Sequence, residues 1–457
     1  MKKINIDDRL REECGVFGVF GHQDATQLTV LGLHALQHRG QEAVGIVSFD
    51  GSKFLSERRL GLVGDNFTKQ PILDRLSGIS AIGHVRYSTR GETILRNVQP
   101  LFADLATGGF SVGHNGNLTN ALLLRDKLVA EGAIFQSTSD TEVILHLVAN
   151  SKKIKFIDKF IDAIGRLEGA YSLVALTNKK LIGARDPLGI RPLVLGKLDT
   201  SYILASETCA LDIIGASFIR EIENGEVIVI TDEGIESYFP FPKQNARPCI
   251  FEYIYFAMPH SIIDGKSVYS IRKELGKFLA KEDDISPDLV VPVPDSGVPA
   301  ALGYSQESQI TFDYGLIRNH YVGRTFIEPT QTIRQFGVRL KHSANTHLVK
   351  NKKIILIDDS LVRGTTSVKI VRMLFDAGAS EVHLRIASPP IRFSDYYGID
   401  TPEQESLLAA NHTIEEMRDY IGCSSLKFLS IKGLYQALGH SDRDNKIPQY
   451  TDHCFTG

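Results

Sequence analysis

Cys14 is the first candidate nucleophile in this sequence, because thirteen mostly charged residues lead directly into it. Cys14 opens the glycine-spaced apolar segment CGVFGVFG. If the leader Met1–Glu13 is removed, Cys14 gains a free α-amine, a group with a pKa of about 8 in reference peptides. That amine can take the proton of the thiol, so that one residue supplies nucleophile and base. The alternative is that Cys14 is a small core residue, as single cysteines usually are.

Residues that could bind an amino-acid substrate follow along the first half of the chain. Asn115 and Gly116, in GHNGNL, offer a side-chain amide beside a backbone N–H, as an oxyanion hole requires. The segment TSDTEVI has the pattern of a capping box, Ser139 with Glu142, which predicts Asp140 in the first helical turn. Asp140 could bind a substrate's ammonium group while an arginine pairs with its carboxylate. The remaining candidates are Arg39, Arg86 and Thr89. The alternative for Arg39, Arg86 and Asp140 is that each is an ordinary surface or structural residue.

The segment IILIDDSLVRGTTSVKIV, which ends at Val371, predicts a strand, a polar loop and then a helix. Open α/β sheets bind ligands at the carboxyl ends of their strands, and helix N-termini attract anions. Asp358 and Asp359 could hold ribose hydroxyls directly or through a magnesium ion. The alternative is an ordinary strand–turn–helix with solvated acids. The predicted phosphate contacts are Ser360, Arg363, Gly364, Thr365 and Thr366.

Two further segments could complete a diphosphate site. VPVPDSG, at residues 291–297, ends another strand in a turn where Ser296 could meet the diphosphate or its metal ion. The segment 321–343 is strongly basic, and a loop that closes over a diphosphate needs such charge. The alternative for this segment is a solvated loop. Its basic residues are Arg324, Arg334, Arg339 and Lys341.

The elements that must position these residues differ between the two halves. Short strands in runs, with helices between them, predict an antiparallel α+β layer fold for residues 14–239. The proline-rich segment FPFPKQNARP predicts a linker near residues 239–248. Strands that are apolar on both faces alternate with helices in residues 240–457, which predicts a doubly wound parallel sheet. Residues 1–13 are predicted to be a separate leader.

The composition excludes several classes of protein. The net charge of −3 provides no global attraction to nucleic acid or to anionic membranes. No apolar run approaches the roughly 20 residues that span a bilayer, and the charged leader lacks the apolar region of a secretory signal. The five cysteines are odd in number and scattered, which favours a reducing compartment over a disulfide framework. We therefore predict a cytoplasmic protein that binds neither nucleic acid nor membrane.

Both sets of motifs resemble known families. CGVFG, HRGQE, HVRYST, HNGN and SDTE resemble the N-terminal-nucleophile glutamine amidotransferases, and IILIDDSLVRGTT resembles the signature of the type I phosphoribosyltransferases. In combination they resemble the amidophosphoribosyltransferase family. The resemblance implies a four-layer αββα antiparallel sandwich followed by a doubly wound parallel-sheet domain. It also implies glutamine-dependent conversion of 5-phosphoribosyl 1-diphosphate to 5-phosphoribosylamine, the first committed step of purine synthesis, with ammonia channelled between the two sites.

The resemblance also assigns roles by position. Cys14 corresponds to the nucleophile, and Asn115 and Gly116 to the oxyanion hole. A homo-oligomer, either dimer or tetramer, and inhibition by purine nucleotides are implied as well. L-Glutamine would be bound by Arg39, Arg86, Thr89 and Asp140, Mg²⁺ by Ser296, Asp358 and Asp359, and the 5-phosphate by residues 360–366.

The sequence departs from the family pattern at one cofactor site. Some family members hold a four-iron iron–sulfur cluster on four cysteines, and thiolates are the expected ligands of such clusters. Only two of the four positions are cysteines here, so we do not expect a cluster. A zinc site at Cys249, His453 and Cys454 lacks a ligand-pair spacing. The four corresponding positions are Cys249, Asp395, Thr451 and Cys454.

Three other functions stay open at this stage. A phosphoribosyl-diphosphate sensor that controls transcription would need a basic patch or a DNA-reading helix, but 51 basic residues stand against 54 acidic ones. An inactive regulatory paralogue is suggested only by Met258 and His260, which stand where the family commonly has arginine and aspartate. An amidotransferase with another acceptor conflicts with IILIDDSLVRGTT. Glutamine-dependent release of diphosphate would exclude the first two.

Overall fold

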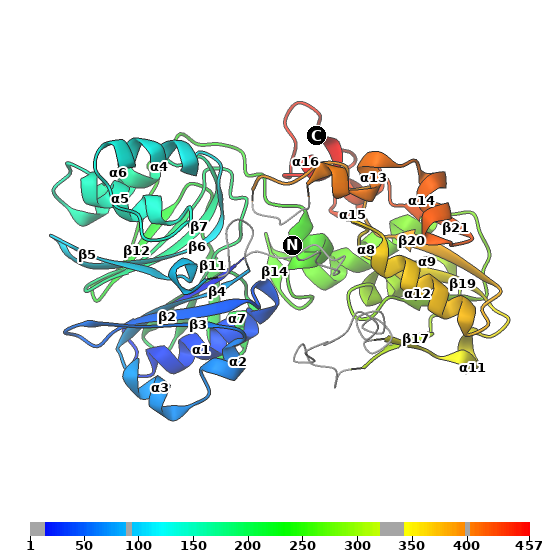
Figure 1. The fold of residues 1–457 in the computed structure, drawn as a ribbon, viewed down its shortest axis with the longest axis horizontal. Coiled ribbons are helices and arrows are strands. Elements are labelled where there is room, and N and C mark those ends of the chain that lie inside the picture. Colours follow the sequence, from blue (N-terminus) through cyan, green and yellow to red (C-terminus); the bar gives the residue numbers. More distant parts are fainter. Residues whose placement is uncertain (1–13, 88–93, 320–341, 398–402) are drawn as a thin grey trace.

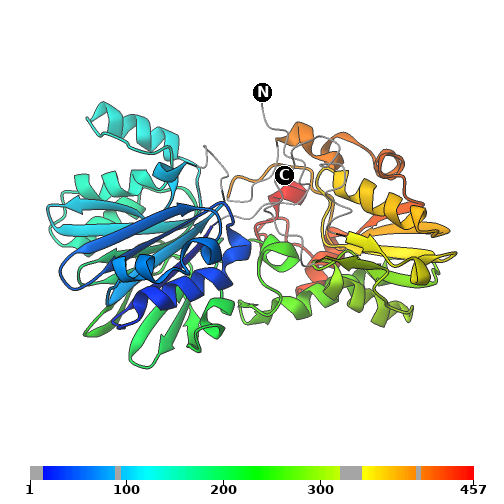
Figure 2. The same cartoon turned by 60° about the horizontal axis from the view of Figure 1, so that its bottom comes forward.

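The structure is a computed structural model that describes residues 14–87, 94–319, 342–397 and 403–457. Its two halves lie side by side, and the C-terminal end of the chain lies near the junction between them (Figures 1 and 2). Among the described residues, no helix combines the length and the apolar character needed to cross a membrane.

The first half contains two antiparallel sheets. The seven-stranded sheet runs in the order β11 (Ser217–Glu221), β9 (Val194–Leu198), β10 (Ser201–Ala205), β1 (Gly15–Phe20), β4 (Ser80–Arg86), β2 (Ala43–Phe49) and β3 (Phe54–Leu60). The six-stranded sheet runs in the order β13 (Gly234–Tyr238), β12 (Val227–Thr231), β8 (Leu181–Arg185), β7 (Gly169–Thr177), β6 (Gly108–Leu118) and β5 (Leu101–Leu105).

These sheets pack face to face, with a layer of helices on each outer side (Figure 1). Val16 and Ile82 from the first sheet meet Val174 and Leu181 from the second in one apolar core between the sheets. The four-layer αββα fold is thus confirmed, because each sheet buries one face on the other sheet and one on helices. On the first sheet lie α1 (Ala25–Ala35), α2 (Val63–Asn66), α3 (Gln70–Arg75) and α7 (Cys209–Asp212), and on the second α4 (Ala121–Ala130), α5 (Glu142–Asn150) and α6 (Phe156–Ile164).

The second half contains a four-stranded parallel sheet, in the order β16 (Leu289–Pro292), β19 (Lys353–Asp358), β20 (Glu381–Ile386) and β21 (Ser425–Phe428). Val290 and Ile355 face the core under α8 (Val268–Lys281) and α9 (Val298–Ser308). Val291 and Leu356 face the opposite core under α12 (Thr365–Asp376) and α14 (Ile414–Ile421). Both faces are covered by helices, so the predicted doubly wound sheet is confirmed.

Short elements complete the second half. Two small antiparallel pairs are β14 (Ile262–Ile263) with β15 (Lys266–Ser267), and β17 (Leu316–Arg318) with β18 (His342–Ala344). Between the halves, β13 ends at Tyr238, and the next regular element is the π-helical turn η3 (Glu252–Phe256), whose residues are mostly buried. The other short helices are α11 (Thr346–Val349), the 3₁₀ turn η4 (Gln404–Ser406), α13 (Leu408–Asn411), α15 (Ile431–Ala437) and α16 (His453–Thr456).

Helices α8 and α9 cross at glycines. A Cβ atom on Gly276 would lie 1.8 Å from the carbonyl oxygen of Ala300, and one on Gly303 would lie 1.9 Å from that of Lys273. The obstructing atoms belong to helical backbone, which cannot yield as a flexible side chain does. This crossing supports α9, which begins at Val298, directly after the PDSG turn that contains Ser296.

We expect Gly276→Ala to lower the free energy of unfolding by about 2–3 kcal/mol, because the added methyl group forces the two backbones apart. Urea unfolding followed by circular dichroism measures the change. Ser270→Ala, at an exposed position of the same helix, is the matched control and should change the free energy by less than about 0.5 kcal/mol. Equal stability of the two variants would contradict the close crossing.

Candidate active sites

Cys14 lies at the start of β1, a central strand of the seven-stranded sheet. Its side chain is buried, and its backbone has a φ of 35°, which is rare for a residue other than glycine. Gly15 is paired with Val85 of β4, so Cys14 lies near the end of β4 that carries Arg86. The carbonyl oxygen of Cys14 accepts a hydrogen bond from Nε of Arg39 at 3.4 Å. The leader lies outside the described residues.

Arg39 is brought to Cys14 by a backbone contact of its neighbour. A Cβ atom on Gly40 would lie 2.6 Å from the backbone nitrogen of Arg86, so only glycine allows this approach. The guanidinium of Arg39 is 1% exposed. It donates to Glu207 Oε1 at 2.5 Å, and to Glu252 Oε1 and Oε2 at 2.6 and 3.0 Å. The structure therefore places Arg39 beside Cys14, with its charge balanced by two buried carboxylates.

Glu207 and Glu252 were not singled out from the sequence. Burial raises the pKa of Glu207, but His38 and Arg39 outweigh that effect and hold the pKa well below its usual range. Glu207 is therefore ionised and forms a full ion pair with Arg39. Neither glutamate lies in a motif with a chemical signature, so only their contacts in the folded chain reveal them.

Arg86 and Asn115 come from the two packed sheets, Arg86 from the end of β4 and Asn115 from β6. Arg86 ends β4, is buried, and donates to the backbone carbonyl of Asn97. Asn97 was not predicted. Its side chain in turn bonds to Thr138, with Nδ2 donating to the hydroxyl at 2.9 Å. Thr89, the other predicted contact in this region, lies outside the described residues.

The amide of Asn115 is fully buried, yet neither Oδ1 nor Nδ2 has a hydrogen-bond partner within the described residues. An unpartnered buried amide costs about 1–3 kcal/mol, so its persistence indicates a group that a ligand would satisfy. Gly116 follows with a φ of 138°, and a Cβ atom there would lie 2.1 Å from the carbonyl oxygen of Ala170. The two residues of the predicted oxyanion hole thus lie side by side on β6.

The predicted capping box is wrong. Helix α5 begins at Glu142, and Asp140 precedes it. The carboxylate of Glu142 accepts hydrogen bonds from the backbone nitrogens of Gln136 and Ser137 and from the Ser137 hydroxyl, so it stabilises the preceding loop. Tertiary folding of that loop overrode the local pattern.

Asp140 is nevertheless held in a defined position beside β6. Its Oδ2 accepts from the backbone nitrogen of Leu118 at 3.1 Å and lies 3.6 Å from Nδ1 of His114. Burial lowers the pKa of His114 despite the nearby carboxylate, so the ring is neutral near pH 7. The side chain of Asp140 is 25% exposed. Asp140 therefore remains available to a cationic group. We call Cys14, Arg39, Arg86, Asn115, Gly116 and Asp140 the Cys14 site.

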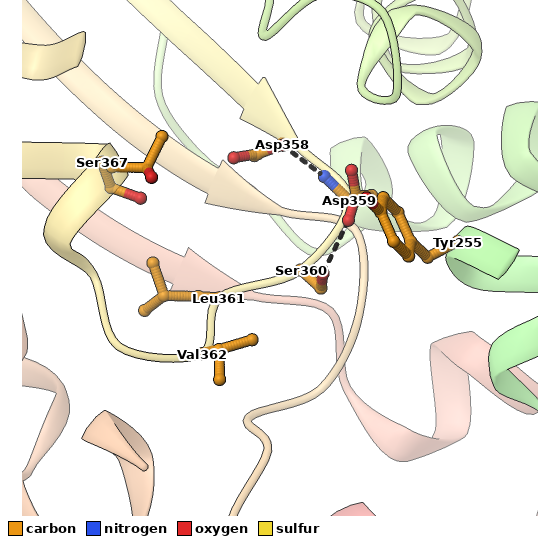
Figure 3. Close-up of a pocket in the computed structure, with 8 residues that line it drawn as sticks. Tyr255, Asp358, Asp359, Ser360, Leu361, Val362 and Ser367 are labelled. Atoms are coloured by element: carbon orange, nitrogen blue, oxygen red, sulfur yellow. Dashed lines mark hydrogen bonds between the residues drawn. The ribbon is translucent and has the colours of Figure 1, made fainter. Parts of the chain in front are cut away.

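The acid pair of the second half lies where strand β19 ends (Figure 3). The backbone nitrogen of Asp359 donates to Asp358 Oδ1 at 3.0 Å, and the Ser360 hydroxyl donates to Asp359 Oδ1 at 2.6 Å. Tyr255, from the π-helical turn η3, lies beside Asp359 and was not predicted. A pocket here is lined by Tyr255, Asp358, Asp359, Ser360, Leu361, Val362, Thr366 and Ser367, which we call the Asp358 site.

The loop after the acid pair leads into a helix that glycine caps. Gly364 is the N-cap of α12, with a φ of 77°, and a Cβ atom there would lie 2.9 Å from Leu408 Cδ2. Glycine has no side chain to occupy the helix N-terminus, and Thr365 and Thr366 form the first helical residues. Backbone N–H groups at such a terminus bind anions. The predicted strand, loop and helix are therefore formed.

Ser296 comes from the neighbouring strand end. Strands β16 and β19 are parallel, with Pro292 opposite Ile357. The turn after β16 stays close to β19, because a Cβ atom on Gly297 would lie 2.4 Å from the carbonyl oxygen of Ile357. Ser296 and Asp358 thus reach the same edge of the sheet. The basic residues predicted to close over the site, Arg324, Arg334, Arg339 and Lys341, lie outside the described residues.

Comparison with known proteins identifies the family. A model of the glutamine amidotransferase domain matches residues 84–212, and one of the phosphoribosyl transferase domain matches residues 261–387. An amidophosphoribosyltransferase from Rhizobium etli is 61% identical over 456 residues, which cover 98% of this chain and 92% of that relative. The chain belongs to the amidophosphoribosyltransferase family. It is therefore a transferase that carries a glutamine amidotransferase domain.

Other relatives support the same family assignment. The amidophosphoribosyltransferase of Bacillus subtilis is 47% identical over 449 residues, covering 98% of this chain and 94% of that relative. The solved structure of glutamine phosphoribosylpyrophosphate amidotransferase from B. subtilis, complexed with ADP and GMP, matches with a TM-score of 0.91 at 46% identity. That match covers 97% of this chain and 96% of the solved one. The predicted function, glutamine-dependent amination of phosphoribosyl diphosphate in purine biosynthesis, is confirmed at the level of the family.

The positions that hold cysteines in cluster-bearing family members come together in the second half. Cys249 and Thr451 form a β-bridge, and the Thr451 hydroxyl donates to the Arg247 carbonyl at 2.7 Å. Asp395 accepts from the Tyr397 backbone nitrogen at 2.8 Å. Burial raises the pKa of Cys249 to about 12 and that of Cys454 well above its usual value, so both thiols are protonated. Asp395 and Thr451 offer no thiolate, so these four residues do not fit an iron–sulfur cluster.

We expect Asn115→Ala to lower the rate of glutamine hydrolysis by about 100- to 1000-fold, because it removes one donor of the oxyanion hole. Thermal stability should change little, since the lost amide has no partner within the described residues. Glutamate release and calorimetry measure the two effects.

Asn66→Ala is the control with the opposite pattern. The Asn66 amide donates to the carbonyls of Leu60 and Leu62, both at 2.9 Å. This variant should lose stability and keep glutamine hydrolysis. Normal glutamine hydrolysis by Asn115→Ala would show that Asn115 is not part of the oxyanion hole.

Proposed function

We propose that this chain hydrolyses glutamine at the Cys14 site and transfers the released ammonia to phosphoribosyl diphosphate at the Asp358 site. The observation that supports this most strongly is the buried Asn115 amide beside Gly116, which has no hydrogen-bond partner within the described residues. In the other half, β19 ends at the acid pair Asp358 and Asp359, and the glycine-capped helix α12 follows. The first feature suits acyl transfer, and the second suits a phosphorylated ribose.

In the first half, we infer that removal of residues 1–13 frees the α-amine of Cys14. The amine takes the thiol proton, and the sulfur attacks the side-chain carbonyl carbon of glutamine. The developing oxyanion accepts hydrogen bonds from Asn115 Nδ2 and the Gly116 N–H. The protonated α-amine of Cys14 then gives its proton to the amide nitrogen, ammonia leaves as the thioester forms, and water hydrolyses the thioester to glutamate and the free thiol. Asp140 pairs with the ammonium group of glutamine, and Arg39, Arg86 and Thr89 provide the remaining contacts.

In the second half, residues 360–366 bind the 5-phosphate, and Asp358 and Asp359 bind the ribose hydroxyls. Two carboxylates at a strand end suit Mg²⁺, which takes one or two carboxylates and completes its shell with phosphate oxygens and water. Ser296 would be its third protein ligand. When bound, the ion would offset negative charge on the diphosphate. The nitrogen of ammonia forms a bond to C1 of the ribose as the bond from C1 to diphosphate breaks.

The proposal includes the wider organisation of the chain. The leader comprises residues 1–13, the glutamine amidotransferase domain residues 14–239, and the phosphoribosyltransferase domain residues 240–457. Ammonia passes through an interior channel, because water would consume the activated ribose if the second site stayed open. The functional form is a homo-oligomer, either dimer or tetramer, inhibited by purine nucleotides. A cytoplasmic location suits its five free thiols.

Intact-protein mass spectrometry tests the nucleophile. We expect the mature chain to lack residues 1–13, because only a terminal Cys14 has its own amine as base. Cys14→Ala should retain the leader, lose glutamine hydrolysis, and still form phosphoribosylamine from free ammonia. Glutamine hydrolysis by a chain that retains its leader would contradict the free-amine mechanism.

Asp359→Asn tests the second site. It should lower the formation of phosphoribosylamine by about 100-fold with either glutamine or ammonia, because both routes share the ribose site. Diphosphate release measures both rates. Chelation of divalent cations should have the same effect on both. Asp419→Asn, which alters an exposed carboxylate on α14, is the control and should leave both rates unchanged. A loss confined to the glutamine-dependent rate would place Asp359 outside the ribose site.

A further inference from the structure

Glu252 is a buried carboxylate of the second half that contacts the Cys14 site. It lies in the π-helical turn η3, after the proline-rich segment, and is 1% exposed. Its two oxygens accept from Arg39 at 2.6 and 3.0 Å, and Oε1 also lies 3.3 Å from Nη1 of Arg191. Two guanidinium groups of the first half therefore share one carboxylate that the second half supplies.

Arg39 is held between this carboxylate and Glu207. Glu207 lies just after β10 in the first half. It is ionised, so both of its oxygens act as hydrogen-bond acceptors. It accepts a hydrogen bond from Arg39 at 2.5 Å and also from the Met258 backbone nitrogen at 2.9 Å. A buried guanidinium requires such compensation, because a buried charge without a partner costs several kcal/mol. The position of Arg39 therefore depends on both halves.

The third contact of Arg39 reaches the proposed nucleophile. Its Nε donates to the carbonyl oxygen of Cys14 at 3.4 Å. A shift of the guanidinium would therefore break this hydrogen bond and alter the backbone position of Cys14. The same π-helical turn carries Tyr255, which lines the Asp358 site. A segment of five residues thus contacts both sites, with Glu252 at one and Tyr255 at the other.

We propose that Glu252 is a positioning residue for glutamine hydrolysis: it holds Arg39 against Cys14, and so makes the geometry of the first site depend on the second half of the chain. This inference rests on the function proposed above. Glu252 touches neither substrate in this proposal and acts only through Arg39. Its removal would leave Arg39 and Arg191 with one buried carboxylate fewer.

Glu252→Gln is the informative change, because it keeps the size of the side chain and removes its charge. We expect kcat/KM for glutamine to fall by about 10- to 100-fold, the usual effect of losing a charged hydrogen bond in a buried site. The formation of phosphoribosylamine from free ammonia should stay within about twofold of the original chain, which shows that the second half is folded. Glu252→Asp keeps the charge and should lower kcat/KM for glutamine by a smaller factor.

A double-mutant cycle with Arg39→Lys separates this role from general destabilisation. If Glu252 acts through Arg39, adding Glu252→Gln to the Arg39→Lys chain should cost at most about threefold more. Glu221→Gln is the matched control, because Glu221 also joins the halves by accepting a hydrogen bond from the Asp264 backbone nitrogen. It lies on the edge strand β11 and should leave glutamine hydrolysis unchanged.

The outcomes separate the two proposals. Independent, multiplicative losses in the cycle, or full glutamine hydrolysis by Glu252→Gln, would overturn the positioning role and leave the proposed function intact. Equal loss of the ammonia-dependent rate would also overturn it, since the residue would then support the whole fold. An original chain that hydrolyses no glutamine would overturn both proposals.

Discussion

The buried ion pairs of Arg39 are the interaction on which the arrangement of this protein depends. A guanidinium that is 1% exposed is stable only with full compensation. One of its carboxylates, Glu207, comes from the first half and the other, Glu252, from the second. The site around Cys14 is therefore complete only when the two halves are packed together. Both carboxylates also bond to other groups at the junction, so the ion pairs and the packing stabilise each other.

The two sites are built in different ways. The Asp358 site is largely a product of backbone geometry: two neighbouring parallel strands end at one edge, and a glycine-capped helix directs its N–H groups toward that edge. Such a site follows from a short continuous segment. The Cys14 site gathers side chains from the 3₁₀ turn η1 (Gln37–Arg39), from strands of both sheets and from the loop before α5. It therefore depends on how the sheets pack.

The glycines at the two sites show where packing imposes a residue type. Gly40 allows its backbone to lie against that of Arg86, and Gly297 allows the turn after β16 to lie against β19. In each case the nearest atoms belong to the backbone, so a larger residue would move a strand or turn. Each of these glycines comes directly after a candidate site residue: Gly40 follows Arg39, and Gly297 follows Ser296.

The sequence by itself determined the two kinds of fold and most of the candidate residues, because strand periodicity, glycine-containing turns and contiguous motifs are local features. It also predicted the strand, polar loop and helix formed by IILIDDSLVRGTTSVKIV. Only the tertiary structure decided that Glu142 stabilises its preceding loop rather than capping α5. Only it revealed Glu207, Glu252 and Tyr255, since their contacts join segments far apart in the chain, and no local pattern records which buried charges will meet.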